Sequence, residues 1–113
     1  MEDRLSKQEY VRKLLAAYCR TPGTTGMIRR SDRLLAAQLY QRGVPLTTIQ
    51  NALVLVAARR LLRGPGSPPL GTVRSLAYFL PTIDELLNLR VSEDYLQYLR
   101  QKIQPFIKPP QAR

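Results

Sequence analysis

Apolar residues recur at helical spacing along nearly the whole chain, and no stretch alternates apolar and polar residues for long enough to form a strand. The first helix is predicted to begin at Ser6, which has the spacing of a capping box with Glu9. Leu5 and Tyr10 are placed to form a hydrophobic staple across this start. Thr-Pro-Gly at residues 21–23 ends the helix. The spacing of apolar residues therefore predicts an all-α fold.

The second and third helices are predicted to join at a short turn. The second helix is expected over residues 31–42, with Ser31 as its cap. Gly43 follows at the position where helices end in a left-handed conformation, so Val44 is expected to fold back as in a Schellman ending. The third helix is predicted over residues 45–62, because proline suits its first position and RGPGSPP follows its end.

The second half of the chain is predicted to hold shorter helices. Residues 71–80 carry apolar side chains at helical spacing, and Pro81 is expected to break or kink that helix. Residues 82–85 form a second capping-box pattern that is expected to restart it. The last helix is predicted over residues 92–104, with acidic residues in its first turn.

The third helix is expected to form the centre of the fold. Its residues 52–58, ALVLVAA, are apolar over nearly two turns, and a helix that is apolar all round is buried all round. We therefore predict an all-α, compact bundle of five or six short helices around a central buried helix. It is predicted to occupy residues 1–104 as a single helical domain, followed by a flexible basic tail at residues 105–113.

The composition is that of an ordinary globular protein, with 44% hydrophobic residues in a chain of 113. No stretch approaches the roughly 18 consecutive apolar residues of a membrane helix, and charges throughout the first residues argue against a signal peptide. The single cysteine, Cys19, cannot form an internal disulfide. A reducing, cytoplasmic location is therefore expected.

Catalytic chemistry is not expected from these residues. The chain has no histidine, which is the usual general base and a common zinc ligand. Its paired acids, at residues 84–85 and 93–94, fall at predicted helix starts where capping explains them. Cys19 is expected to be a buried structural thiol. We therefore predict a protein that is not an enzyme and that uses no cofactor, metal ion or small-molecule substrate.

The formal net charge of +10 changes this picture because of where the charge lies. Residues 20–74 contain nine arginines, no lysine and a single acidic residue, Asp32. Arginine presents a planar fork of donors that matches phosphate, whereas lysine is a point charge. The distribution favours a polyanionic partner, although a GC-rich genome would enrich arginine in the same way.

Two arginine clusters are the main candidate sites. The first cluster consists of Arg29, Arg30 and Arg33. It surrounds the start of the second helix, where positive charge opposes the helix dipole unless an anion binds there or Asp32 offsets it. The second cluster consists of Arg59, Arg60 and Arg63. It lies at the end of the third helix, where cations are favourable with or without a partner, and Arg74 is a further predicted phosphate contact.

The sequence LLAAQLYQRGVPLTTIQNAL, residues 34–53, resembles the helix-turn-helix superfamily of DNA-binding proteins. Gly43 matches the glycine of the turn, Val44 the apolar residue after it, and Ile49 the buried residue of the second helix. The resemblance implies a helix-turn-helix-like unit in the bundle and three side chains that face the major groove and contact bases. These are Thr47, Gln50 and Asn51.

The match also departs from the family pattern. Leu39 stands where the family prefers alanine, and Pro45 replaces the usual capping serine or threonine. The apolar run at residues 52–58 keeps the rest of that helix from lying along a groove. DNA recognition by the helix tip, a purely structural hinge and contact with another protein therefore all remain open.

A larger unit, residues 32–87, resembles in its layout the helical domains of DnaD-like replication-initiation proteins. A helix, a Gly-apolar-Pro restart, a long alanine-rich helix, a basic loop and SLAYFLPTIDEL follow one another in that order. The resemblance implies binding to DNA and to partner proteins, but the family's tryptophan is absent. Core packing explains most of the tyrosines, while Tyr40 and Tyr78 lie near arginines and are candidates for stacking on bases.

These patterns predict a non-enzymatic nucleic-acid-binding accessory protein of replication, recombination or a mobile element, with DNA favoured over RNA. The predicted phosphate contacts are Arg29, Arg30, Arg33, Arg59, Arg60, Arg63 and Arg74. One alternative is a small helical RNA-binding subunit of a ribonucleoprotein complex. The other is a protein-protein interaction module whose arginines meet an acidic partner.

Overall fold

The structure is a computed structural model that describes residues 5–88 and 91–109. Its elements are α1 (Lys7–Arg20), α2 (Arg30–Gln41), α3 (Leu46–Leu61), the 3-10 helix η1 (Leu76–Phe79), α4 (Leu80–Asn88), α5 (Glu93–Ile103) and the 3-10 helix η2 (Gln104–Phe106). The all-α prediction is confirmed, since the described residues contain no strand and only an isolated bridge between Thr24 and Val73. None of the described helices is both long and apolar enough to span a bilayer.

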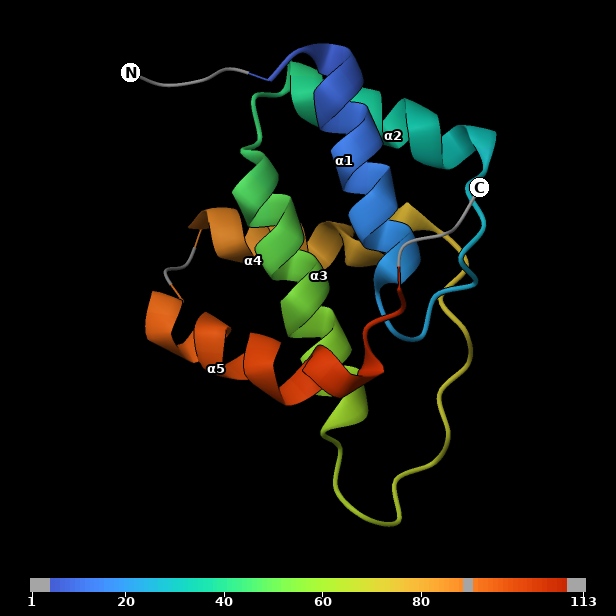
Figure 1. Cartoon of the computed structure of the whole chain (residues 1–113), viewed down its shortest axis with the longest axis vertical. Helices are drawn as coiled ribbons and strands as arrows, with labels where there is room; N and C mark the ends of the chain where they lie inside the picture. The colour runs from blue at the N-terminus through green and yellow to red at the C-terminus, as the bar shows by residue number, and fades with distance from the viewer. Residues whose placement is uncertain (1–4, 89–90, 110–113) are drawn as a thin grey trace.

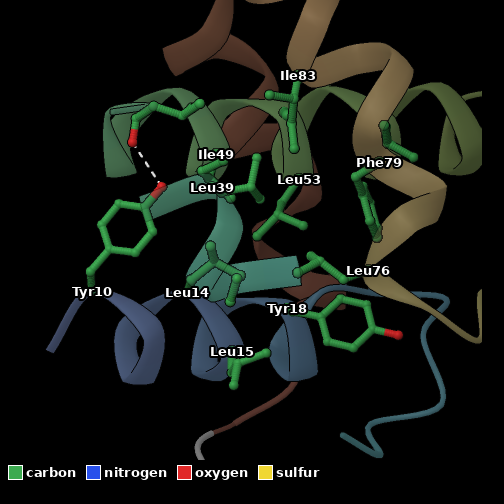
Figure 2. Packing of buried hydrophobic residues seen from close by; sticks show 14 of the residues in the cluster. Tyr10, Leu14, Leu15, Tyr18, Leu39, Ile49, Leu53, Leu76, Phe79 and Ile83 are labelled. Atoms are coloured by element: carbon green, nitrogen blue, oxygen red, sulfur yellow. Dashed lines mark hydrogen bonds between the residues drawn. The ribbon is translucent and has the colours of Figure 1, made fainter. Parts of the chain in front are cut away.

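Helix α3 lies at the centre, as its apolar run predicts. It contacts α1, α4 and α5, and Figure 1 shows α4 passing behind it and α5 crossing its lower end. Side chains on several faces of α3 are buried, including Ile49, Ala52 and Leu55. Figure 2 shows Ile49 and Leu53 between the side chains of α1 on one side and Ile83 of α4 on the other.

Three of the predicted helix ends are confirmed in atomic detail. The hydroxyl oxygen of Ser6 accepts from the backbone N–H of Glu9 at 3.1 Å, and α5 begins after Ser92 in the same way. Gly43 has φ +76°, and Val44 N–H donates to the carbonyl of residue 39 in a Schellman ending. These ends could be predicted because each depends only on residues within one turn of it.

The predicted start of α2 is wrong by two residues. Ser31 lies inside the helix, and Arg29 occupies the cap position in an extended conformation. The carboxylate of Asp32 accepts from the backbone N–H of Arg29 at 2.9 Å. Asp32 thus supplies the reciprocal bond of a capping box, from the third helical position back to the cap residue.

The helix predicted over residues 71–80 does not form in its first half. Residues 71–75 are not helical, and Val73 exchanges backbone hydrogen bonds with the loop after α1. Helix α4 then begins at Leu80, so Pro81 lies in its first turn, where proline needs no backbone N–H. Thr82, expected to restart a helix as its cap, is buried inside α4.

The part of the predicted tail that the structure describes, residues 105–109, is attached to the body of the fold. Lys108 N–H donates to the carbonyl of Arg20 at 3.0 Å, and its ammonium donates to the carbonyl of Thr24 at 2.6 Å. Residues 110–113 lie outside the described residues.

Candidate functional site

A buried carboxylate attaches the start of α2 to the start of η1. Asp32 is 1% exposed. One of its oxygens accepts from the backbone N–H of Arg29, and the other accepts from the backbone N–H of Leu76, both at 2.9 Å. The first cluster is therefore held beside residues that lie more than forty positions later in the chain.

The same segment is fixed on its other side by the loop after α1. Val73 N–H donates to the carbonyl of Gly23 at 2.7 Å, and Thr25 N–H donates to the carbonyl of Val73 at 3.0 Å. Val73 is buried by this pairing, whereas the next residue, Arg74, is exposed. Arg74 therefore stands on a short segment that Asp32 joins, two residues later, to the helix start that carries the first cluster, whose three arginines are also exposed.

The second cluster reaches the same segment from the end of α3. Arg60 donates to the hydroxyl of Tyr78 at 3.0 Å and to the carbonyl of Gly71 at 2.5 Å. Its guanidinium also lies against Gly23, where an added β-carbon would stand 3.3 Å from Nε. Arg60 thus contacts both ends of residues 71–78, at Gly71 and Tyr78, and also the loop after α1 at Gly23.

The other two arginines of the second cluster also have partners. Arg59 donates two hydrogen bonds to the carboxylate of Glu85, at 3.0 and 2.8 Å, and these bonds lower the pKa of Glu85. Arg63 donates to the carbonyl of Pro68 at 2.6 Å. The three arginines line one open groove of about 410 Å³ together with Tyr78, so the structure brings the whole second cluster to a single place.

The three side chains that the helix-turn-helix resemblance assigns to bases lie elsewhere. Thr47 is exposed on the first turn of α3, about 18 Å along the helix from Arg59 at 1.5 Å per residue. Gln50 and Asn51 are half-buried and face α5. Asn51 accepts a hydrogen bond from Arg100, and Gln50 lines a separate groove of about 310 Å³ between α1, α3 and α5.

Two basic residues beside the loop after α1, Arg20 and Lys108, were not predicted from the sequence as site residues. Arg20 donates from Nε to the carbonyl of Lys108 at 3.0 Å, and both residues lie beside the loop that also contacts Arg60. Arg20 belongs to the arginine-rich stretch, but nothing near Lys108 in the sequence indicates that it returns to Thr24. Contact between segments so far apart has no local signal.

Reactive groups of other kinds are sparse near the site. Cys19 is half-buried, and burial raises the pKa of its thiol, which keeps it protonated at neutral pH. Across residues 5–88 and 91–109, no group of three or more cysteine or carboxylate side chains is arranged to hold a metal ion. The chemistry that the arrangement offers is hydrogen bonding and charge attraction to an anion.

No family model matches the chain, and no match was found among the curated proteins or the solved structures.

Proposed function

We propose that this protein is a non-enzymatic accessory protein that binds the phosphate backbone of nucleic acids, with DNA favoured, in replication, recombination or the functions of a mobile element. The observation that carries the proposal is the position of residues 71–78. Asp32 attaches the first cluster to this segment, and Arg60 attaches the second cluster to it. Arg74 is exposed on the segment between them.

The charge around this segment supports an anionic partner. Asp32 is the only acidic residue between positions 20 and 83, and both of its oxygens are committed to backbone N–H groups. The stretch therefore offers arginines to solvent without any exposed carboxylate of its own. Glu85 is the acid beside the groove, and it is engaged by Arg59 alone. Such a field attracts phosphate and makes binding strongly dependent on salt.

Backbone contacts are expected to contribute more than contacts to bases. Of the three side chains that the helix-turn-helix resemblance assigns to bases, only Thr47 is exposed, while Gln50 and Asn51 are half-buried. Thr47 also stands at the opposite end of α3 from the second cluster. We therefore expect modest sequence preference, because phosphate contacts carry no direct information on sequence.

The proposal is tested by titrating the protein with duplex DNA and duplex RNA over a series of salt concentrations. We expect binding at low salt that weakens steeply as salt rises, with Arg29→Glu plus Arg30→Glu reducing affinity at least about tenfold and flattening the slope. Both changes place acid at a helix start, which favours the helix dipole, so the fold should be kept. Lys7→Glu plus Lys13→Glu on α1 makes the same change of charge and should cost clearly less.

The results separate the proposal from its two alternatives. Absence of binding to either nucleic acid at low salt contradicts the proposal. If the Arg29→Glu, Arg30→Glu protein instead loses a protein partner in a pull-down, the interaction-module alternative takes its place. Clearly tighter binding to duplex RNA than to duplex DNA favours the ribonucleoprotein subunit.

A further inference from the structure

The groove that holds the second cluster also contains an exposed aromatic ring. Tyr78 is 48% exposed on η1, and the groove places it beside all three arginines of the second cluster. Leu70 and Pro81 are also exposed there, so the wall around the ring is apolar while its rim is cationic. The volume of about 410 Å³ lies within the roughly 300–1,000 Å³ that is usual for ligand sites.

Tyr78 is held in place without being buried. Its hydroxyl accepts from Arg60, and its ring meets the buried ring of Phe79 edge to face, with centroids 5.6 Å apart. The guanidinium carbon of Arg60 lies over the ring of Tyr78, 5.5 Å from its centroid, on the side of the hydroxyl that it bonds. A ring that is held by these contacts and is still 48% exposed can offer its open part to a planar ligand at little cost in conformational entropy.

The arginines of the groove retain donors beyond the bonds they make. A guanidinium carries five N–H groups, and Arg60 uses one on each terminal nitrogen, while Arg63 uses one. Arg59 gives two to Glu85. Phosphate oxygens can therefore bind Arg60 and Arg63 while the existing contacts of these two arginines remain, whereas the carboxylate of Glu85 competes for Arg59.

We propose that this groove binds an unpaired nucleotide within a single strand of DNA or RNA, with one base stacked on Tyr78 and the neighbouring phosphates bound by the second cluster. The proposal rests on the function proposed above and adds that this groove binds single-stranded nucleic acid. In a duplex both faces of each base are covered by its neighbours, so the ring of Tyr78 gains nothing from paired strands. A base in a single strand has a free face, and an aromatic side chain beside arginines is the usual platform for it.

The chain offers a matched control for Tyr78. Tyr98 on α5 is 53% exposed, and Lys102 lies over its ring at 5.8 Å, but Tyr98 does not line the groove. Its own neighbour is Tyr95, whose ring is stacked against it with centroids 6.5 Å apart. Removal of Tyr98 therefore takes away a comparable exposed ring beside a cation, without touching the proposed site.

The test uses three labelled probes in fluorescence anisotropy: an oligothymidylate, an oligouridylate and a duplex DNA of the same length. Tyr78→Ala is expected to weaken binding of the single strands by about 5- to 150-fold, the loss that corresponds to one base–aromatic stack. Binding of the duplex should change by less than about threefold. Tyr98→Ala should leave all three affinities within the same limit, and the two single-stranded probes show whether DNA or RNA is preferred.

A second variant guards against loss of the fold. Tyr78→Trp retains a ring for stacking and places the only tryptophan in the chain at the groove. We expect it to bind single strands at least as well as the unchanged protein, with its emission quenched as the strand saturates the protein. Thermal unfolding of each variant checks that its fold is intact.

The outcomes distinguish this inference from the proposed function. Equal losses for duplex and single strand in Tyr78→Ala, no loss for either, or unchanged tryptophan emission at saturation would each overturn the single-strand site while backbone binding stands. A failure of every probe to bind the unchanged protein at low salt overturns both proposals together.

Discussion

Two tyrosines on the buried stripe of α1 differ in what their hydroxyl groups contact. Tyr10 donates to the carbonyl of Val44 at 2.7 Å, which ties α1 to the turn between α2 and α3 (Figure 2). The hydroxyl of Tyr18 is buried and has no hydrogen-bond partner among the described residues. A buried hydroxyl without a partner costs roughly 1–3 kcal/mol, whereas a made hydrogen bond contributes about 1 kcal/mol.

Replacement of each tyrosine by phenylalanine should therefore have opposite effects on stability. We expect Tyr10→Phe to lower the free energy of unfolding by about 1 kcal/mol, and Tyr18→Phe to raise it by about 1 kcal/mol. Chemical denaturation near neutral pH measures both. A loss of stability in Tyr18→Phe equal to that in Tyr10→Phe would show that the Tyr18 hydroxyl is bonded after all.

The same two hydroxyls predict a loss of stability in alkaline solution. Burial disfavours the phenolate and raises the pKa of Tyr10 and of Tyr18 to about 12, from the ordinary value of 10.0. Above pH 10 the unfolded chain releases these protons while the folded chain keeps them, so stability falls as the pH rises toward 12. Removal of either hydroxyl should make that fall clearly less steep, as unfolding from about pH 8 to about pH 11 would measure.

At the scale of elements, Asp32 joins the start of α2 to the start of η1. A carboxylate can accept from both Arg29 and Leu76, whereas the amide of an asparagine would present one N–H₂ group toward a backbone donor. Asp32→Asn is therefore expected to lower the free energy of unfolding by about 2–3 kcal/mol. Thermal or chemical denaturation measures the loss.

The control for Asp32 is Asp84, an exposed aspartate that interacts with an arginine side chain. Asp84 lies 3.8 Å from Arg42, and its side chain is 58% exposed. Asp84→Asn should change stability by less than about 0.5 kcal/mol, because exposed ion pairs contribute little. Similar losses in the two variants would mean that the Asp32 carboxylate does not hold the elements together.

Comparison of the elements shows which of them a sequence can predict. The ends at Ser6, Gly43 and Ser92 follow from residues within one turn and were predicted as they occur. Residues 71–75 have a helical pattern of apolar positions, yet Val73 pairs with the loop at residues 23–25. The two paired segments are about fifty positions apart in the chain, so no local sequence pattern predicts the pairing.

At the scale of the whole molecule, the same distinction applies to the candidate site. The arginines themselves stand out in the sequence because acids are missing around them. Their arrangement depends on Asp32, on the carbonyl groups of the loop after α3, and on Glu85. These contacts join distant segments, so only the fold reveals that the second cluster shares one groove with Tyr78.

Glu85 gives the molecule a carboxylate that competes with phosphate for Arg59. Its hydrogen bonds to Arg59 lower its pKa, so it stays charged at neutral pH and holds that guanidinium. Glu85→Gln should release Arg59 and strengthen binding of nucleic acid by about two- to tenfold at low salt. The slope of log affinity against log salt should steepen by about 0.9, the effect of one further phosphate contact.

Glu93→Gln provides the comparison that isolates this effect, because it makes the same change of net charge at the exposed start of α5. If the net charge alone mattered, both variants would bind with the same slope. If Arg59 is the group released, only Glu85→Gln steepens the slope of log affinity against log salt. Acidification should also strengthen binding of nucleic acid by the unchanged protein, because Glu85 takes up a proton at a pH below the usual range for a glutamate. That acid-induced gain should be missing in Glu85→Gln, which has no carboxylate to protonate at this position.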